Sequence, residues 1–498
     1  MSKISIEQIA AFCKRKGFVF PSSEIYGGMS GFFDYGPLGM ELARNIKNLW
    51  WKSVVLDREI VEGIDGSIIS SNKVWEASGH VDNFVDYLVS CKKCKTEYRA
   101  DHLIEDVLKI PADGMDIKKL SELIKKNKIK CNKCKGELGD VRKFNLMFET
   151  NIGPSGKDKA FLRPETAQLI YINFKNVLET SRQKLPFGIA QIGKAFRNEI
   201  SPRNFLFRMR EFEQMEMEFF VHPNGKDECP EFDLIKKVKV NVLTAKEQAS
   251  KLPKTAPSTI SDLLKKKIFK TKWHAFWVGY RYQWFLNHGI NPKNLRLREH
   301  VKDELSHYST ATWDIEYNYP FGWKELEGCA DRTDYDLNQH SKFSGEKLEY
   351  FDIQTKERVT PHVAAEPSLG VERAFLTFML DAYNEETVKG EKRIVLKLHP
   401  SLSPYKVAVF PLVKKDGLSE EAKKIFKLLK EKFHAFYDEG GSIGRRYRRM
   451  DEIGTPVCIT CDYDTLKDKS VTLRDRDSMK QTRIKIKDLE KELTKTLK

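Results

Sequence analysis

Charged residues are crowded into the stretch 190–220, which otherwise has the apolar, extended character of paired strands. From residue 214 onward apolar and polar residues alternate, and in a strand this puts them on opposite faces. The apolar face would carry Met215, Met217 and Phe219, and the polar face Gln214, Glu216 and Glu218. Carboxylates that share a face repel one another, so they need an arginine, a metal ion or an ammonium ligand nearby. This stretch therefore predicts a surface that binds a cation.

A hairpin is needed to bring these side chains together. We predict strands at residues 189–196 and 205–221, joined by a loop at 198–204 that contains Pro202. The hairpin would present Arg197, Glu199, Arg208, Arg210, Glu211, Glu213, Glu216 and Glu218.

The string Phe196-Arg197-Asn198-Glu199, followed by Arg208 and Phe212, resembles motif 2 of the class II aminoacyl-tRNA synthetases. The wider string resembles the glycyl-tRNA synthetase family in particular. Three further segments are also similar to that family: residues 75–84, 144–156 and 160–168. For the tetrapeptide taken alone, an exposed charged hairpin is the alternative. The resemblance implies an α+β fold with an antiparallel sheet in the catalytic domain.

Two later segments extend the resemblance. Residues 365–374 resemble motif 3; the general class II pattern has glycine where Ser368 stands, and the glycyl family has serine. Residues 324–336 place Glu325 and Glu327 on one face of a predicted strand. Paired carboxylates of this kind suit Mg²⁺ bridging the phosphates of a nucleotide. We therefore expect Mg²⁺ with ATP at Glu325.

The resemblance implies a reaction without a protein nucleophile. Glycine's carboxylate attacks the α-phosphorus of ATP and displaces pyrophosphate, and a terminal ribose hydroxyl of tRNA then takes the glycyl group and releases AMP. Arg197 and Arg373 are the expected catalytic residues, acting by positioning and charge stabilisation. The residues expected to bind ATP are Arg197, Asn198, Glu199, Phe207, Arg208, Met209, Arg210, Glu211, Phe212, Glu325, Leu326, Gly370, Val371, Glu372 and Arg373. Those expected to bind glycine are Arg99, Glu165, Phe212, Glu213, Gln214, Met215, Glu216, Glu366, Pro367, Ser368, Leu369 and Gly370.

Glycine offers only an ammonium and a carboxylate for recognition. The resemblance implies that Glu165, Glu216 and Glu366 surround the ammonium while Ser368 adds a hydrogen bond. Crowded acids of this sort are expected to have raised pKa values in the empty site. The alternatives are three unrelated surface glutamates and, for Glu165, a first-turn acid favoured by the helix dipole.

Two C-x-x-C pairs point to a metal. Cys91, Cys94, Cys131 and Cys134 provide four thiolates from two tight turns, which suits tetrahedral Zn²⁺. A redox dithiol is the alternative, but it requires only one pair. Cys458-Ile-Thr-Cys461 has no partner pair nearby and is expected to lie in the core.

Composition limits the class of protein. The 498 residues suggest two to four domains. A formal net charge of +15 favours a polyanionic partner, which the resemblance implies is tRNA(Gly). Nine cysteines without a signal-like start argue against a secreted disulfide framework. No apolar run approaches the length of a membrane span. We expect a cytoplasmic protein that does not bind membranes.

We expect a catalytic domain at residues 1–90 and 141–398, interrupted by a zinc-ribbon-like insert at 91–140 and a helical insertion at 222–295. The second insertion is lysine-rich; it could lie over the acceptor end of an RNA or be a solvated decoration. Helix 41–55 and strand 59–69 resemble motif 1, which implies a homodimer, although a core helix within one subunit is the alternative.

Residues 399–498 alternate between predicted strands and helices and resemble an α/β anticodon-binding domain. The basic cluster 444–449 inside it, with Tyr447 between arginines, is suited to phosphates and stacked bases.

The predicted function is therefore ATP-dependent activation of glycine and its transfer to the 3′ end of tRNA(Gly). Two alternatives are an inactive relative that binds nucleic acid and a class II synthetase for another amino acid. Retention of Arg197, Glu199, Arg208 and Arg373 disfavours the first. The combination of Glu165, Glu216, Glu366 and Ser368 disfavours the second.

Overall fold

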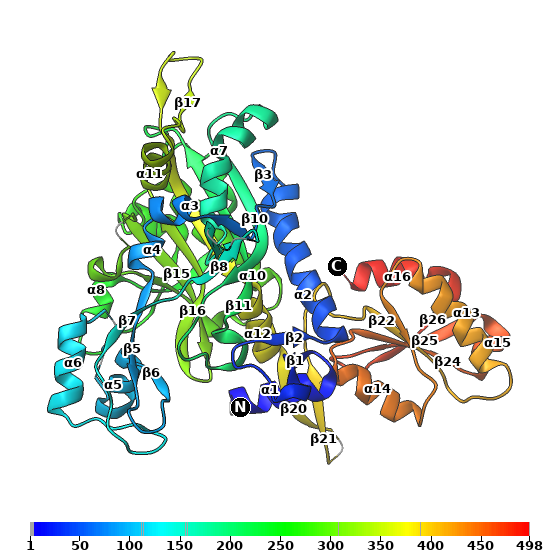
Figure 1. Cartoon of the computed structure of the whole chain (residues 1–498). Coiled ribbons are helices and arrows are strands. Elements are labelled where there is room, and N and C mark those ends of the chain that lie inside the picture. Colours follow the sequence, from blue (N-terminus) through cyan, green and yellow to red (C-terminus); the bar gives the residue numbers. More distant parts are fainter. Residues whose placement is uncertain are drawn as a thin grey trace.

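The structure is a computed structural model that describes residues 4–110, 112, 114–154, 156, 158–306, 308–388 and 390–497 (Figure 1). Its main body is built on a nine-stranded sheet in the order β13-β12-β14-β15-β16-β19-β11-β10-β3. Neighbours run antiparallel except at β12–β14 and β10–β3. The predicted antiparallel α+β architecture is confirmed. The strands are β3 (Val61–Ile64), β10 (Phe187–Phe196), β11 (Glu211–Val221), β12 (Lys239–Leu243), β13 (Ala256–Thr259), β14 (Leu295–Glu299), β15 (Ala311–Tyr319), β16 (Gly322–Asp331) and β19 (His362–Gly370).

Helices pack on both faces of this sheet. One core contains residues of α1 (Ile6–Lys16), α2 (Pro37–Trp51), α10 (Lys272–Asn287) and α12 (Val371–Ala382). A second core contains residues of α7 (Ala167–Ser181) and α11 (Tyr335–Ser344).

The predicted alternation along β11 is confirmed. The apolar side chains belong to the first core, where the ring of Phe219 lies 4.5 Å from that of Trp273. Glu218 points the other way and accepts a hydrogen bond from Tyr171 of α7 at 2.5 Å. The sheet therefore presents an acidic surface toward α7.

The second strand of the hairpin is shorter than predicted. It begins at Glu211 rather than at residue 205, and residues Phe205–Phe207 form a 3₁₀ turn. Asn204 and Phe205 have φ angles of 61° and 57°, a left-handed conformation that a strand cannot contain. The turn carries Phe207 and Leu206 into the cleft beside the strands.

Two other predicted boundaries shift for local reasons. Helix α2 starts at Pro37 instead of residue 41, because proline suits the first turn of a helix. The single strand expected at 59–69 is split into β3 and β4 (Ile69–Ser71). Between them Gly66 packs so closely on the next layer that a Cβ atom there would lie 2.8 Å from Cβ of Leu169.

The cysteine-rich insert forms a separate module at the lower left of Figure 1. Its three-stranded sheet, β6-β5-β7, reaches beyond the predicted range 91–140 on both sides. A small core around Leu103, Ile104 and Leu120 holds its helices against the sheet. The elements are β5 (Val85–Ser90), β6 (Glu97–Arg99), α5 (Ala100–Leu108), α6 (Ile117–Lys126) and β7 (Arg142–Asn145).

The segment 222–295 is integrated into the main body. Its strands β12 and β13 extend the nine-stranded sheet, and α10 lies in the first core. Trp273 and Trp277 of α10 are almost completely buried. This helix is therefore not a solvated decoration, which was one of the two alternatives.

The C-terminal unit is an α/β domain, as predicted. Its five-stranded sheet has the order β23-β22-β24-β25-β26, and Cys458 and Cys461 are buried in it as expected. Helix α13 ends at Lys430, and β23 begins at Ala435. The elements are β22 (Val407–Pro411), α13 (Leu418–Lys430), β23 (Ala435–Tyr437), α14 (Ile443–Glu452), β24 (Val457–Cys461), α15 (Tyr463–Asp468), β25 (Ser470–Asp475), β26 (Gln481–Lys485) and α16 (Leu489–Thr496).

The two units share a core at their junction. Leu396 and Leu402 belong to the same apolar cluster as Phe410 and Met450 of the C-terminal domain. Arg393, on the hairpin of β20 (Tyr383–Val388) and β21 (Glu391–Leu396), is also fully buried and donates to Asp451 at 3.0 Å. The junction is therefore packed like the interior of a single domain.

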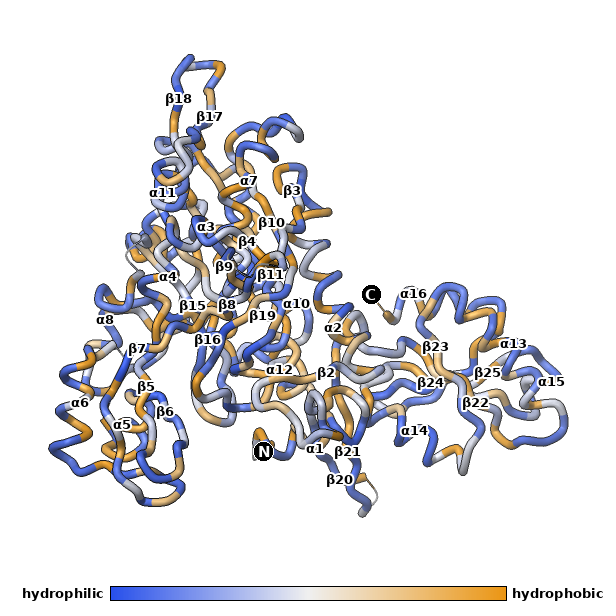
Figure 2. Tube along the Cα trace, viewed as in Figure 1, coloured by the Kyte–Doolittle hydropathy of each residue, from blue (hydrophilic) through white to orange (hydrophobic). Residues whose placement is uncertain are grey.

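Apolar residues gather along the central strands of both units, whereas α14 is mainly hydrophilic (Figure 2). Among the described residues, no helix combines the length and apolar character required to cross a membrane.

Candidate active site

A cavity of about 270 Å³ opens where the hairpin, β16 and the β19–α12 junction meet. Residues far apart in the sequence converge there. All of the lining residues except Leu206 are among the residues expected to bind ATP or glycine. The lining consists of Arg197, Glu199, Leu206, Phe207, Arg208, Met209, Phe212, Gln214, Glu325, Ser368, Gly370, Glu372 and Arg373.

Arg197 follows the end of β10, and its guanidinium is held from several sides. Its Nε donates to the carbonyl of Pro164 at 3.0 Å. The rings of Phe84 and Phe212 lie 5.5 and 5.3 Å from its Cζ atom. Its Nη groups make no hydrogen bond to any residue that the structure describes. A positioned arginine with unused donors is suited to bind a phosphate or a carboxylate.

Arg208 is held by Glu199 across the mouth of the cavity. Its Nε donates to Oε2 of Glu199 at 2.7 Å, and its Nη2 lies 3.8 Å from Asp86 of the cysteine-rich module. Arg210 points elsewhere, because it donates to the backbone oxygens of Ser30 and Glu199. Arg210 therefore fixes the loop that contains Ser30 and does not line the cavity.

Arg373, in the first turn of α12, forms the opposite wall. It donates to Oε1 of Glu325 at 2.9 Å and lies 4.6 Å from the ring of Phe207. An arginine stacked on an aromatic ring and paired with one half-exposed carboxylate can exchange that partner for an anionic ligand.

Glu325 and Glu327 do not share a face, contrary to the prediction. The pairing of β15 with β16 shifts register at Ile315/Glu316. Glu325 therefore pairs with Glu316 and Glu327 with the adjacent residue Ile315. Adjacent residues of a strand point to opposite faces, and so do the two glutamates. Glu325 reaches the cavity, whereas Glu327 is buried in an ion pair with Arg281 of α10 at 2.7 Å.

The carboxylate that accompanies Glu325 is instead Asp314 of β15. Asp314 Oδ1 and Glu325 Oε1 lie 3.8 and 3.9 Å from the Cβ position that a side chain at Gly328 would have. Burial raises the pKa of Asp314 to about 6, and the charge of Glu325 adds to this effect. Sequence reasoning missed Asp314, although its position on the neighbouring strand is readable from the alternation of residues 313–317.

Another buried acid, Glu372, supports the floor of the cavity. Its Oε2 accepts the backbone N–H of Glu213 at 2.9 Å. Burial raises its pKa to about 7. Glu213 itself is paired with Lys47 of α2 at 3.0 Å. These contacts tie the hairpin to α2 and α12.

An acidic cluster adjoins the inner end of the cavity, at Gln214 and Ser368. Glu216 faces Ser368 across β11 and β19 and accepts a hydrogen bond from Oγ1 of Thr166 at 2.5 Å. Glu366 lies on β19, and Glu165 stands just before α7. Burial raises the pKa of Glu366 to about 8, opposed by Arg332 and increased by the charges of Glu216 and Glu165.

The pKa values of the cluster do not all rise. Burial raises the pKa of Glu216, and the charge of Glu165 adds to it. Glu165 differs, because although burial raises its pKa, His80, Arg332 and Gln168 outweigh that effect and the net pKa falls. His80 Nε2 lies 3.3 Å from Oε2 of Glu165. The expectation of raised pKa values is therefore wrong for Glu165.

Arg332 is the cation that sequence reasoning missed. It contacts both Glu366 and Asp336, at 2.8 and 2.9 Å. Gln168 donates to Glu165 and to Asp336, which joins the acids of the cluster into one network. The four-residue spacing of Arg332 and Asp336 at the start of α11 was the available signal.

Several predicted residues lie near the site but not in it. Met215, Leu326, Leu369 and Val371 have their side chains in the first core. Arg99 lies in the cysteine-rich module, between Asp101 at 2.5 Å and Asp86 at 3.2 Å. Its role in binding glycine stays a prediction.

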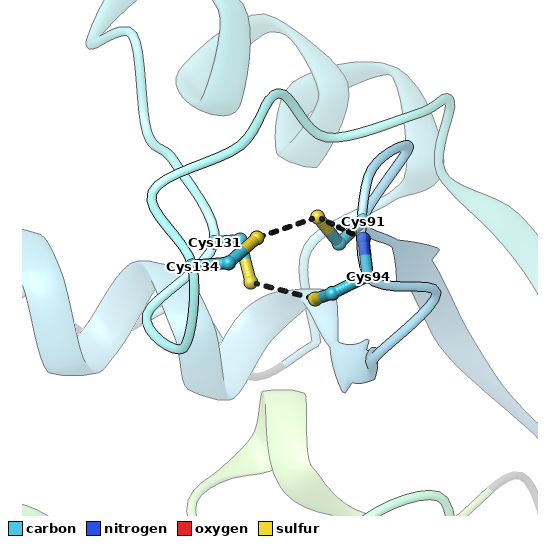
Figure 3. Close-up of side chains that lie close together, drawn as sticks. All are labelled: Cys91, Cys94, Cys131 and Cys134. Carbon is cyan, nitrogen blue, oxygen red and sulfur yellow. Dashed lines mark hydrogen bonds between the residues drawn. The ribbon is translucent and has the colours of Figure 1, made fainter.

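The four cysteines of the insert meet as predicted (Figure 3). Their sulfur atoms all lie within 4.8 Å of one another. Cys91 and Cys134 are 3.5 Å apart, as are Cys94 and Cys131, so the four are not joined as disulfides. Tyr98 and Thr96 place hydroxyls 3.0 and 3.1 Å from Cys131 and Cys94. This donor set fits tetrahedral Zn²⁺.

The arginines of the basic cluster 444–449 are not equivalent. Arg446 is buried and donates to backbone oxygens at the end of β22. Arg449 is paired with Asp438 at 2.5 Å. Arg445 is exposed on α14. The helix therefore presents fewer available cations than its sequence suggests.

Comparisons with known proteins agree with this architecture. Residues 148–246 match the family model "tRNA synthetase class II core domain (G, H, P, S and T)", and residues 406–496 match "Anticodon binding domain". Two curated relatives are the glycine–tRNA ligases of Caldanaerobacter subterraneus subsp. tengcongensis and Clostridium acetobutylicum. The first is 50% identical over 100% of this chain and 99% of its own length, and the second 48% identical over 99% of both.

A crystal structure of prolyl-tRNA synthetase from Cryptosporidium parvum, complexed with halofuginone and AMPPNP, has a similar fold. The TM-score is 0.60 at 13% identity, over 99% of this chain and 77% of that chain. At this identity the likeness concerns the fold alone.

Proposed function

The chain belongs to the glycine–tRNA ligase family, and we propose how its residues divide the work of that family's reaction. The reaction is ATP-dependent attachment of glycine to tRNA, through activation of the amino acid. The assignment of roles rests on one observation. The acidic cluster of Glu165, Glu216 and Glu366 adjoins the arginine-lined cavity at Gln214 and Ser368. One compartment is suited to a nucleotide's phosphates and the other to an ammonium.

ATP occupies the cavity in this proposal. Arg197 binds the α-phosphate and the glycine carboxylate with its Nη groups, which places the two reactants in line. Phe212 and Glu199 hold the adenine, the latter through the oxygen that Arg208 does not engage. Arg208 and Arg373 bind the polyphosphate tail, and Arg373 leaves Glu325 when ATP arrives.

Mg²⁺ accompanies ATP in class II synthetases. We assign Glu325 as its protein ligand, with Asp314 beside it as a second hard oxygen donor. Bound there, Mg²⁺ would neutralise charge on the phosphates. Release of Glu325 from Arg373 would make both the carboxylate and the guanidinium available to MgATP.

Glycine binds at the inner end. Glu165, Glu216 and Glu366 surround its ammonium, and Ser368 contributes a hydrogen bond. Specificity then depends on holding the ammonium firmly and leaving no space beside the α-carbon, because glycine has no side chain to recognise. A cation bound among these acids would favour their ionised forms and so oppose the effect of burial, which raises the pKa of Glu216 and of Glu366.

The remaining parts serve tRNA and assembly. We assign residues 1–90 and 141–398 to catalysis, 222–295 to an insertion in that domain, and 399–498 to the anticodon of tRNA(Gly). The insert 91–140 holds structural Zn²⁺ through its four cysteines. We propose a homodimer formed through α2 and β3, since β3 is an edge strand of the sheet. We place the protein in the cytoplasm.

Aminoacylation tests this proposal. Purified protein with ATP, Mg²⁺, labelled glycine and tRNA(Gly) should give acid-precipitable label and AMP. Omission of ATP or tRNA should abolish the label. Glycine-independent retention of tRNA without any charging would instead support the inactive, nucleic-acid-binding alternative.

A further inference from the structure

Arg332 is fixed more completely than an ordinary ion pair requires. It follows β16 and is 3% exposed. Its Nε and Nη2 donate to the two carboxylate oxygens of Asp336, each at 2.9 Å, which is the bidentate geometry of a strong arginine–carboxylate pair. Its Nη1 donates to Oε1 of Glu366 at 2.8 Å.

Aromatic rings restrain the guanidinium further. Its Cζ atom lies 3.8 Å from the ring centre of Tyr308 and 5.5 Å from that of Tyr171. Asp336 thus fixes one edge of the group while Tyr308 covers a face. Nη1 is left as the part of the guanidinium that reaches the acidic cluster.

The contact leaves one oxygen of Glu366 available. Arg332 engages Oε1, and Oε2 makes no hydrogen bond to any residue in the described part of the chain. Free rotation of this carboxylate would break the contact with Nη1. A ligand that approaches Glu366 therefore meets an acceptor whose orientation is already set.

The charges around Arg332 indicate why such an anchor matters. Glu165, Glu216, Glu218, Glu366 and Asp336 all interact with its charge or bond to it directly. Burial raises the pKa of Glu218 well above its usual value, and this acid accepts a hydrogen bond from Tyr171. Arg332 is thus a permanent positive charge placed among several acids. This one charge does not match the number of carboxyl groups around it.

We infer that Arg332 is a positioning residue for glycine selection: held by Asp336, it fixes Glu366 so that the carboxylate meets the substrate ammonium without reorganising. This inference rests on the proposed function of the cluster as the glycine site. Arg332 does not line the arginine-lined cavity, and among the described residues its direct bond to the three glutamates of the proposed glycine site is the one to Glu366. Its loss must therefore affect glycine and ATP differently.

The test uses Arg332→Lys in glycine-dependent pyrophosphate exchange. Lysine keeps the charge but cannot make the forked contact with Asp336 and Glu366 together. We expect the KM for glycine to rise about ten- to a hundredfold, the range for loss of a hydrogen bond between charged groups, with little change in the KM for ATP. Equal changes in both KM values would overturn the inference.

A matched control separates positioning from folding. Arg281→Lys removes a similar fork, because Arg281 is 0% exposed and bonds to both oxygens of Glu327 on β16, the strand that Arg332 follows. It lies on the α10 side of the sheet, away from the cluster. This variant should lose thermal stability like Arg332→Lys but keep both KM values. An equal rise in its glycine KM would show that Arg332 has only a structural role.

Two further readouts keep the inference testable if Arg332→Lys is unstable. In a double-mutant cycle, Arg332→Gln should raise the glycine KM little further once Glu366→Gln is present, since both substitutions act through the Glu366 carboxylate. Additive effects of the two substitutions on the glycine KM would contradict the inference. The profile of kcat/KM for glycine against pH should also move to higher pH in Arg332→Gln, because Glu366 would lose its counter-charge. An unmoved profile would contradict it.

The charged and titratable groups that face Glu366 in that titration are Arg332, Asp336, Glu165, Glu216, Glu218, Tyr171, Tyr308, Cys329 of β16 and, through Glu165, His80. Wild-type protein that fails to activate glycine at all would refute the proposed function. Wild-type activity combined with an unchanged ratio of the two KM values in Arg332→Lys would refute the positioning role alone.

Discussion

Replacing Arg197 by alanine tests how the cavity stabilises the reacting phosphate. The side chain is anchored by its Nε–Pro164 hydrogen bond and by the rings of Phe84 and Phe212, while its Nη groups have no partner among the described residues. Alanine removes those free donors and leaves the neighbouring walls in place. The variant should therefore lose stabilisation of the transition state more than it loses folding stability.

The magnitude follows from donors of the same kind. Removing one preorganised donor from an oxyanion site costs about 2.7–4 kcal/mol, or about 10²–10³ in kcat. In the folded protein without substrate, alanine removes one hydrogen bond and weak interactions with the two rings, worth about 1 kcal/mol each. We expect kcat for pyrophosphate exchange to fall by about that factor at saturating glycine and ATP, with a small decrease in Tm.

Arg296→Ala is the matched control. Arg296 is also stacked on an aromatic ring, 4.6 Å from Trp323, and bonded to a carboxylate, Glu316, at 2.5 Å. It does not line the cavity. Its removal should leave kcat unchanged. An unchanged kcat in Arg197→Ala, or an equal loss in Arg296→Ala, would refute the role assigned to Arg197.

Three other predictions test the acidic cluster, the metal and the C-terminal domain. In the wild type the KM for glycine should fall as pH rises toward 8, because the raised pKa of Glu366 keeps this group protonated below about 8 and the ammonium needs the carboxylate. The variant Glu366→Gln should have a higher KM for glycine and lose this pH dependence. A flat pH profile of the wild-type KM would contradict the prediction. Protein purified without chelator should contain one zinc ion per chain, as elemental analysis can determine, and four freely titratable thiols without metal would contradict the site. Arg445→Glu on α14 should raise the KM for tRNA in aminoacylation and leave pyrophosphate exchange intact; equal loss of both activities would contradict the assigned role.

The packing of the domain junction is the reason for testing the C-terminal domain with Arg445→Glu. Truncation after residue 398 is the simplest test of the C-terminal domain that the sequence suggests. It would expose Leu396 and Leu398, which pack in the same core as Phe410 and Met450. A surface charge change at Arg445 avoids this damage to the catalytic body.

Features that depend on local pattern and on residue chemistry could be predicted from the sequence. The alternation after residue 214 placed Met217 in the core and Glu216 on the acidic face, as the structure has them. The spacing of the four cysteines predicted their cluster. These features depend on the periodicity of one strand or on two tight turns, so they do not require knowledge of distant contacts.

The errors arose where tertiary contacts override the local pattern. A register shift in β16 separated Glu325 from Glu327, and nothing in the alternating sequence signals the shift. His80, from a distant segment, lowered the pKa of Glu165 against the expectation for crowded acids. The role of Arg332 could not be identified from the sequence, because it depends on contact with Glu366. The two residues become neighbours only when β16 and β19 pair.

Pyrophosphate exchange measured with each of the twenty amino acids tests most directly whether the site activates glycine. The assay requires no tRNA, so it reports on the cavity and the acidic cluster alone. Glycine should support rapid exchange, and alanine should be a very poor substrate, because the cluster holds the ammonium and leaves no room for a side chain. Comparable exchange with alanine or serine, or no exchange with glycine, would contradict the proposed specificity.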